Sequence, residues 1–175
     1  MTITSLPLWL PAVFVLLIGA GTAQARTRVV RPGTAAVLAA AFLAFSLYGV
    51  TAAFGLEPAA LAAWSAGIAA ALATGDRVFV PRGLAHADGG IRVPGSWTPL
   101  TLMMTIFAVK TALGFAFALR WPVAHAVWFE SLAAFTLGLA SGGFTARAAA
   151  LRRFASRREA VTALRSSRPG SPSPT

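Results

Sequence analysis

Residues 97–120 read WTPLTLMMTIFAVKTALGFAFALR, and this stretch decides the fold class of the chain. Its apolar part, Leu100 to Leu119, matches the roughly 20 residues with which an α-helix crosses a bilayer. It encloses Lys110, the only lysine of the sequence. An ammonium group at that depth costs roughly 2.5–3.5 kcal/mol on insertion scales, so it normally faces a partner or a wet cavity. The stretch therefore predicts a membrane helix that carries a candidate functional residue.

The composition of the whole chain indicates the same class. Of 175 residues, 57% are hydrophobic and 11% are charged, whereas soluble domains have ~25% charged residues. The net charge of +10 comes mainly from fourteen arginines. They lie between or after the apolar runs, where they orient membrane proteins, and this placement argues against nucleic-acid binding. There is no cysteine, and His86 and His125 are far apart, so we expect neither a metal nor a cofactor.

Four further apolar runs complete the predicted fold, an all-α integral membrane protein with a bundle of five transmembrane helices in residues 1–147. The first run ends in Ala23-Gln24-Ala25, which resembles a signal-peptidase site. Cleavage there would export the arginine-rich tail, against the positive-inside rule, so we expect a retained span. The spans are predicted at residues 6–25, 34–54, 59–74, 98–119 and 127–146.

Small residues and one polar loop add detail to this prediction. The third span is rich in alanine and glycine, which favours close helix packing and a central place in the bundle. In the fifth span, Gly138 and Gly142 form a small-x-x-x-small packing motif. In the loop at residues 75–96, the β-prone pieces Arg77–Val80 and Ile91–Val93 flank a turn sequence, so a hairpin is one possibility.

The C-terminal part is strongly basic. Residues 148–165 predict an amphipathic juxtamembrane helix on the inner membrane surface, with Leu151 and Phe154 toward the lipid. Residues 166–175 are mostly serine and proline and are predicted to be disordered. Five arginines are expected to contact anionic lipid headgroups: Arg147, Arg152, Arg153, Arg157 and Arg158.

Arginine placement also predicts the orientation. In a five-span arrangement, thirteen of the fourteen arginines share one side, and only Arg120 lies on the other. The positive-inside rule makes the arginine-rich side cytoplasmic. We therefore expect an outside N-terminus and a cytoplasmic C-terminus.

Several short pieces carry a family resemblance. They are Ser46-Leu47-Tyr48-Gly49, Val93-Pro94-Gly95-Ser96-Trp97 with Pro99-Leu100, Phe107 with Lys110, and Ser141-Gly142 ahead of Arg147. With them the chain resembles a family of small bacterial multipass inner-membrane proteins classified only as a domain of unknown function. Members often carry a tyrosine after the lysine, where this chain has Thr111, and an acid at Glu130 is not typical of them. The resemblance implies an inner-membrane location and assigns no activity.

The candidate polar site consists of Lys110, Glu130, Tyr48 and His125. Lys110 and Glu130 lie ten residues before and after Arg120, hence up to ~15 Å from the turn. Three alternatives follow: a buried ion pair, an unpaired Glu130 near the outer headgroups, or a proton- or ion-conducting element. Tyr48 either offers Lys110 a hydroxyl or packs in the bundle as an amphipathic side chain. His125 either extends a relay or is a lone outer-loop histidine without a chemical role.

No catalytic motif accompanies these residues, so no catalytic residue is assigned and an enzyme is disfavoured. The sequence favours an uncharacterised membrane protein with a structural or accessory role, in a homo-oligomer or with another membrane protein. One alternative is a small transporter or proton-coupled carrier that uses Lys110 with Glu130. The other is a membrane enzyme or assembly factor. The expected partners are the bilayer and its anionic headgroups.

Overall fold

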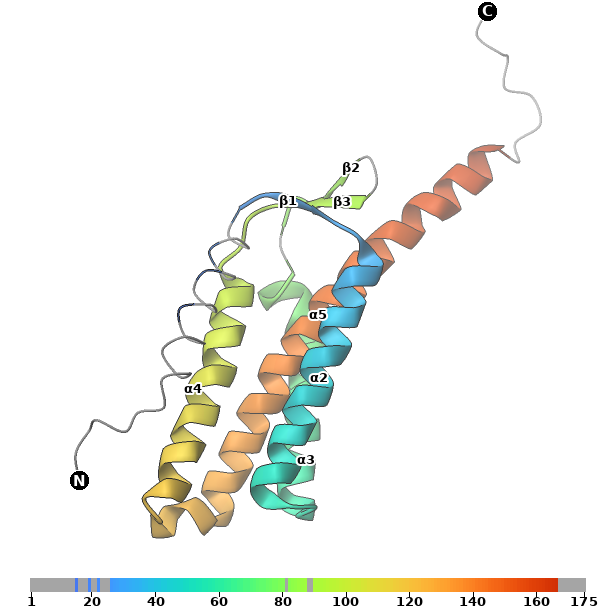
Figure 1. Ribbon diagram of the computed structural model, residues 1–175. Coiled ribbons are helices and arrows are strands. Elements are labelled where there is room, and N and C mark those ends of the chain that lie inside the picture. Colours follow the sequence, from blue (N-terminus) through green and yellow to red (C-terminus); the bar gives the residue numbers. More distant parts are fainter. Residues whose placement is uncertain are drawn as a thin grey trace, which may run out of the picture.

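The computed structural model describes residues 15, 19, 22, 26–80, 82–87 and 90–166, with side chains as far as Arg157 except at position 76. This part is a helix bundle that carries a small sheet at one end (Figure 1). The predicted first span at residues 6–25 and the predicted disordered tail at 166–175 lie outside the described residues, apart from positions 15, 19, 22 and 166.

Four long helices form the described bundle: α2 (Pro32–Phe54), α3 (Pro58–Val78), α4 (Thr98–Ala118) and α5 (Val127–Ser166). Each of the first three has a proline at its first or second position, where the missing N–H costs nothing. By length and composition, α2, α4 and residues Pro58–Gly75 of α3 are able to cross a membrane. Helix α5 is less apolar than these three segments, because it contains Glu130, serines and glycines.

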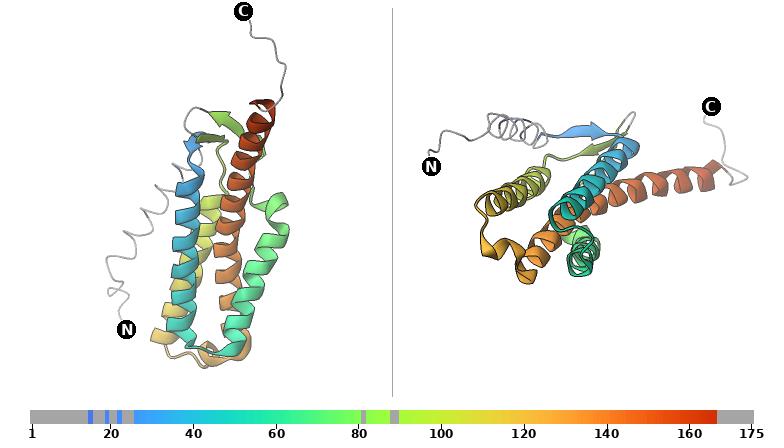
Figure 2. Two further views of the ribbon diagram at one scale, coloured as in Figure 1. Left: turned by 90° about the vertical axis from the view of Figure 1, so that its right-hand side faces the viewer. Right: turned by 60° about the horizontal axis from the view of Figure 1, so that its bottom comes forward.

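The bundle is built around α5, which the other three described helices contact (Figure 2). On α5, Ala134 and Leu137 are fully buried. The expectation that the third span is central was wrong. Small residues of α3 and α5 form one close interface instead: a Cβ on Gly67 of α3 would meet the Phe135 carbonyl, and one on Gly142 of α5 would lie 2.9 Å from Ile68 Cα.

The fold is not all-α as predicted, since it includes a three-stranded antiparallel sheet in the order β1-β3-β2. The strands are β1 (Arg28–Val30), β2 (Ala85–Ala87) and β3 (Gly90–Val93). In the register, Val29 faces Arg92 and His86 faces Ile91. The sheet forms because β-branched residues bury one face: Ile91 and Val93 are each 2% exposed.

The hairpin considered for residues 75–96 exists with a different first strand. β3 contains Ile91–Val93, but its hairpin partner is Ala85–Ala87. The other β-prone piece, Arg77–Val80, begins inside α3. The helix extends this far because it keeps packing on α5, where a Cβ on Gly75 would lie 2.6 Å from Ala146 Cβ.

The basic C-terminal segment continues α5 as one helix that extends past the sheet (Figure 1). Leu151 is 3% exposed and packs against Ile91 and Val93. Phe154 stacks on His86 with ring centroids 4.5 Å apart. Leu151 and Phe154 therefore face the sheet, where the sequence suggested lipid.

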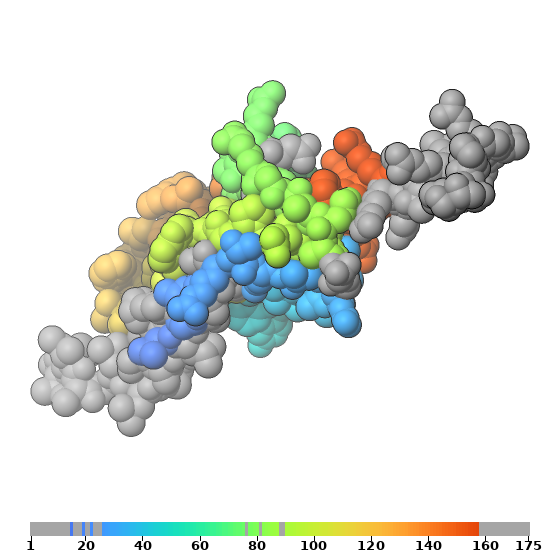
Figure 3. All heavy atoms as spheres, turned by 90° about the horizontal axis from the view of Figure 1, so that it is seen from above, coloured from blue at the N-terminus to red at the C-terminus, as the bar shows by residue number. Residues whose placement is uncertain are grey.

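We call the end that carries the sheet the arginine-rich end. Figure 3 looks down on it, and β1 and the β2–β3 hairpin lie across the bundle there. The opposite turn end contains the connection at Gly55–Glu57 and the 3₁₀ turn η2 (Pro122–His125). Because β1 pairs with β3, the loop before α2 and the loop before α4 lie at the same end of the bundle.

Candidate functional site at Lys110

Lys110 lies deep within α4, twelve residues after Thr98 and eight before Ala118. At ~1.5 Å per residue it is roughly 18 Å and 12 Å from the two helix ends. The side chain is half-buried and turns toward α2. Its Nζ lies 4.2 Å from the centroid of the Phe45 ring, in cation–π geometry.

Gly49 of α2 makes room for this amine. A Cβ at position 49 would meet Lys110 Nζ and would lie 2.9 Å from Cε. Phe45 and Gly49 are four residues apart, so helix geometry places them on the same face of α2. The Ser46-Leu47-Tyr48-Gly49 piece thus contributes to the lysine site through its glycine.

Ser46 of the same piece holds three helices together. Its side chain is fully buried, and its Oγ donates to the Leu137 carbonyl of α5 at 3.1 Å. Trp64 Nε1 of α3 donates to Ser46 Oγ at 2.9 Å. Sequence reasoning missed this link, for which the signal was a lone serine in an otherwise apolar stretch of α2.

A cavity of about 410 Å³ lies beside Lys110 on the outer side of the α2–α4 pair, and we call it the Lys110 groove. Tyr48, at its edge, is 68% exposed. Among the described residues, no atom lies within 4 Å of a Cβ built on Gly114. Small side chains therefore leave space next to the amine. The lining residues are Tyr48, Gly49, Ala52, Ala53, Lys110, Leu113, Gly114 and Phe117.

Glu130 does not share this site. It lies in the first turn of α5, ~4.5 Å from the helix start, whereas Lys110 is ~12 Å from the end of α4. The connection through η2 delays the start of α5, so equal spacing from Arg120 does not give equal depth. Among the described side chains, no salt bridge joins Lys110 to Glu130, and Lys110 contacts Phe45 and Gly49 instead.

His125 also lies apart from Lys110. It is an exposed residue of η2 at the turn end, with its ring centroid 5.9 Å from that of Phe117. Of the predicted polar residues, only Tyr48 lines the groove together with Lys110. In the part of the chain with described side chains, no group of three or more histidine, aspartate or glutamate residues is placed to hold a metal ion.

The arginines expected at lipid headgroups do not form one set. Arg152, Arg153 and Arg157 are exposed on α5, while the side chain of Arg158 lies outside those described. Arg147 is only 8% exposed, and its Nη1 donates to the Phe79 carbonyl at 3.4 Å. Arg147 thus lies in the interior beside a cavity that residues of β1, α2 and α5 line, whereas Arg152, Arg153 and Arg157 point outward.

Comparison with known families matches residues 1–162 to a model described as "Family of unknown function (DUF6622)". This confirms the resemblance to a family classified only as a domain of unknown function. No curated protein and no solved structure matches the chain.

Proposed function

The chain belongs to the family of unknown function DUF6622, and from its geometry we propose an accessory membrane protein that holds an acidic partner helix in the Lys110 groove. The observation that carries the proposal is the position of Lys110. Its amine lies at mid-length of an apolar helix, beside an outward-opening groove, with an aromatic ring as its described contact.

The cost of placing Lys110 in a bilayer exceeds the stabilisation from its contact with Phe45, which favours an additional partner for the amine. A lysine at this depth costs roughly 2.5–3.5 kcal/mol. A cation–π contact returns ~0.5–2 kcal/mol, depending on how dry the pair is. After the contact with Phe45, roughly 0.5–3 kcal/mol of the insertion cost of Lys110 remains uncompensated. A carboxylate in the groove would offset this remainder.

The shape of the groove suits a helix as the occupant. Gly49, Ala52, Ala53 and Gly114 line it, and residues of this size let helix backbones approach closely in lipid. Tyr48 places a phenol at the edge, where its hydroxyl is available to a carboxylate oxygen.

We propose that the acidic partner helix belongs to a different protein and not to a second copy of this chain. The apolar helices α2 and α4 and residues 58–75 of α3 contain no acid. Glu130 lies too near the turn end to match the depth of Lys110 in a parallel copy. The carrier alternative also needs Glu130 beside Lys110, which the described contacts do not provide.

The proposal includes an orientation with the arginine-rich end in the cytoplasm, following the positive-inside rule. Reporter fusions after Arg31, in the loop at 82–87 and after Arg158 should report the cytoplasm. Fusions at Glu57 and Arg120 should report the outside. A C-terminal fusion that reports the outside would contradict this orientation.

The docking test uses a synthetic apolar helix with one central glutamate, and an identical helix with glutamine there. Each carries a fluorophore and is mixed with the labelled protein in phosphatidylcholine vesicles, where energy transfer measures association. The glutamate helix should associate more strongly with the wild-type protein. Lys110→Met should abolish the preference, and Lys110→Arg should keep it.

The control variant is Phe115→Met, since Phe115 is 46% exposed on α4 and is not among the groove residues. This variant should associate with the glutamate helix in preference to the glutamine helix as strongly as the wild-type protein does. Equal association of the two helices with the wild-type protein would refute the docking role. So would an undiminished preference in a Lys110→Met protein whose helical content is normal.

A further inference from the structure

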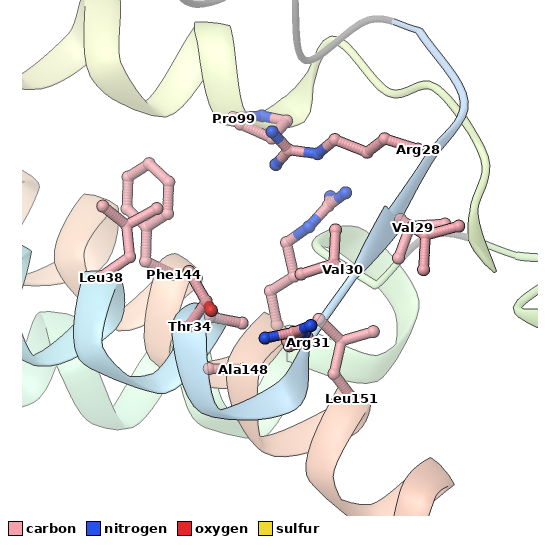
Figure 4. A pocket seen from close by; sticks show the side chains of 13 residues that line it. Arg28, Val29, Val30, Arg31, Thr34, Leu38, Pro99, Phe144, Ala148 and Leu151 are labelled. Atoms are coloured by element: carbon pink, nitrogen blue, oxygen red, sulfur yellow. The ribbon is translucent and has the colours of Figure 1, made fainter. Parts of the chain in front are cut away.

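A second cavity lies at the arginine-rich end, where β1 passes the first turns of α2 and the start of α4 (Figure 4). Its volume is about 390 Å³. In Figure 4, Arg28 extends from β1 toward Pro99 of α4. The polar lining is Arg28, Arg31, Thr34 and Arg147, and the side-chain lining of the rest is apolar. We call this space the arginine cavity.

The cavity concentrates positive charge in a partly enclosed space. Among its described lining residues, three are arginines and none is an acid. Arg147 is 8% exposed, and its described hydrogen bond, to the Phe79 carbonyl, is long at 3.4 Å. Burial, and then the charge of Arg28, lower the pKa of Arg147, which lies one residue beyond the predicted fifth span. A buried guanidinium close to another one is costly unless an anion compensates it.

We propose that the arginine cavity binds a phosphate group. The planar fork of a guanidinium matches the oxygens of phosphate and forms short, charge-assisted hydrogen bonds with them. Thr34 adds a hydroxyl donor in the first turns of α2. The site also lies at the N-terminal end of α2, where the helix dipole favours an anion.

The apolar side of the cavity points to a lipid as the carrier of this phosphate. Leu38, Phe144 and Pro99 line it, and Leu38 is also 40% exposed on the outer side of α2. The cavity lies where α2 and α4 begin, which is headgroup level for helices that span a bilayer. An acyl chain leaving the cavity would follow apolar surface. A free phosphate offers the same oxygens to the arginines, but it has no acyl chain to contact this apolar surface.

The sheet holds Arg28 in place. Arg28 pairs with Val93 across the β1–β3 register, so the strand order fixes its backbone relative to the start of α4. A Cβ on Gly90 would lie 2.8 Å from the Val30 carbonyl, which shows how closely the two strands approach. The cavity shares no described lining residue with the Lys110 groove, so this inference is independent of the proposed docking function.

The test measures ligand binding by the full-length protein in an uncharged detergent. The probes are short-chain phosphatidylglycerol, short-chain phosphatidylcholine and inorganic phosphate. Binding is followed by the thermal unfolding midpoint and by native mass spectrometry. Phosphatidylglycerol should bind best, and inorganic phosphate should compete with it.

Arg31→Gln is the main variant, because Arg31 is exposed and its loss should leave the fold intact. It should weaken phosphatidylglycerol binding by about tenfold, as expected for a lost charge-assisted contact. Arg147→Gln should weaken it at least as much. Arg153→Gln removes the same charge from an exposed position outside the cavity and should change binding little.

The binding results distinguish a lipid phosphate from a free phosphate, and a defined site from diffuse charge. Inorganic phosphate binding as tightly as phosphatidylglycerol would support the phosphate site with a free anion as its ligand. Equal losses in Arg31→Gln and Arg153→Gln would overturn it, because diffuse charge would then explain binding. Equal binding of phosphatidylcholine and phosphatidylglycerol, or no binding of any probe, would also overturn it. Lys110→Met should leave phosphatidylglycerol binding unchanged.

Discussion

Replacing Ser46 with alanine should loosen the contact among α2, α3 and α5. The substitution removes the acceptor of the Trp64 Nε1–H and one donor to the Leu137 carbonyl. Leaving a buried donor unpaired costs ~1–3 kcal/mol, while interhelical hydrogen bonds in membranes average ~0.6 and reach ~1.7 kcal/mol. Trp64 is half-buried, so we expect a loss of ~1–2 kcal/mol.

Ser141→Ala is the matched control, because Ser141 is also fully buried. Its Oγ donates only within its own helix, to the carbonyls of Leu137 and Gly138. Such back-bonding slightly destabilises helices, so Ser141→Ala should be neutral or mildly stabilising. Comparing the two variants separates the loss of an interhelical link from the loss of a buried hydroxyl.

The assay is reversible unfolding in mixed micelles, driven by a denaturing detergent and followed by far-ultraviolet circular dichroism. Trp64→Phe and the double variant complete a thermodynamic cycle, and the coupling energy between the two positions should be ~0.5–1.5 kcal/mol. Equal losses in Ser46→Ala and Ser141→Ala would refute the reasoning. Strict additivity of Ser46→Ala and Trp64→Phe would do the same.

Substitutions at four further positions test the packing of the bundle. Gly138→Ala forces a methyl group against the backbone of α3 and should cost ~1–3 kcal/mol of unfolding free energy. Gly114→Ala, whose methyl group meets no described atom within 4 Å, should be neutral or gain up to ~1 kcal/mol in the same micelle assay. Arg120 lies two residues after the end of α4 and has a φ of 51°, so Arg120→Gly should raise stability by ~0.5–1 kcal/mol while Arg120→Ala should not. Leu151→Ala should cost ~2–5 kcal/mol and speed hydrogen exchange of the β3 amides, because Leu151 is 3% exposed beneath the sheet. Unchanged exchange in β3 would show that Leu151 does not support the sheet.

The described helices follow from local signals in the sequence. Apolar length and the prolines at positions 32, 58 and 99 place α2, α3 and α4 to within a few residues. These signals act within one segment, so a single sequence is enough to reveal them. The starts of the helices are therefore predicted better than their contacts.

The contacts of Lys110 were not predicted, because they depend on features that no short stretch of the sequence encodes. The path from α4 to α5 depends on the unusual backbone of Arg120 and on η2, which together set Glu130 near the turn end. The face that α2 turns to α4 decides that Phe45 and Gly49 receive the amine. Both are properties of the assembled bundle.

The pairing of β1 with β3 was missed for a related reason. The two strands lie about sixty residues apart in the sequence, and each is only three or four residues long. Neither is stable alone, because two short strands need a hydrophobic surface to rest on. That surface is provided by Leu151 of α5, which the amphipathic pattern had assigned to lipid.

The central position of α5 has a consequence for how the protein is made. Among the described helices, α2, α3 and α4 pack mainly on α5 and only slightly on one another. Synthesis runs from the N-terminus, so the helix that all of them need emerges from the ribosome last. Until then the glycine faces of α3 and the hydroxyl of Ser46 have no α5 backbone to meet, and the sheet has no Leu151 beneath it. Nascent chains that stop before residue 127 should therefore hold separate helices, which quality-control proteases will recognise as unassembled.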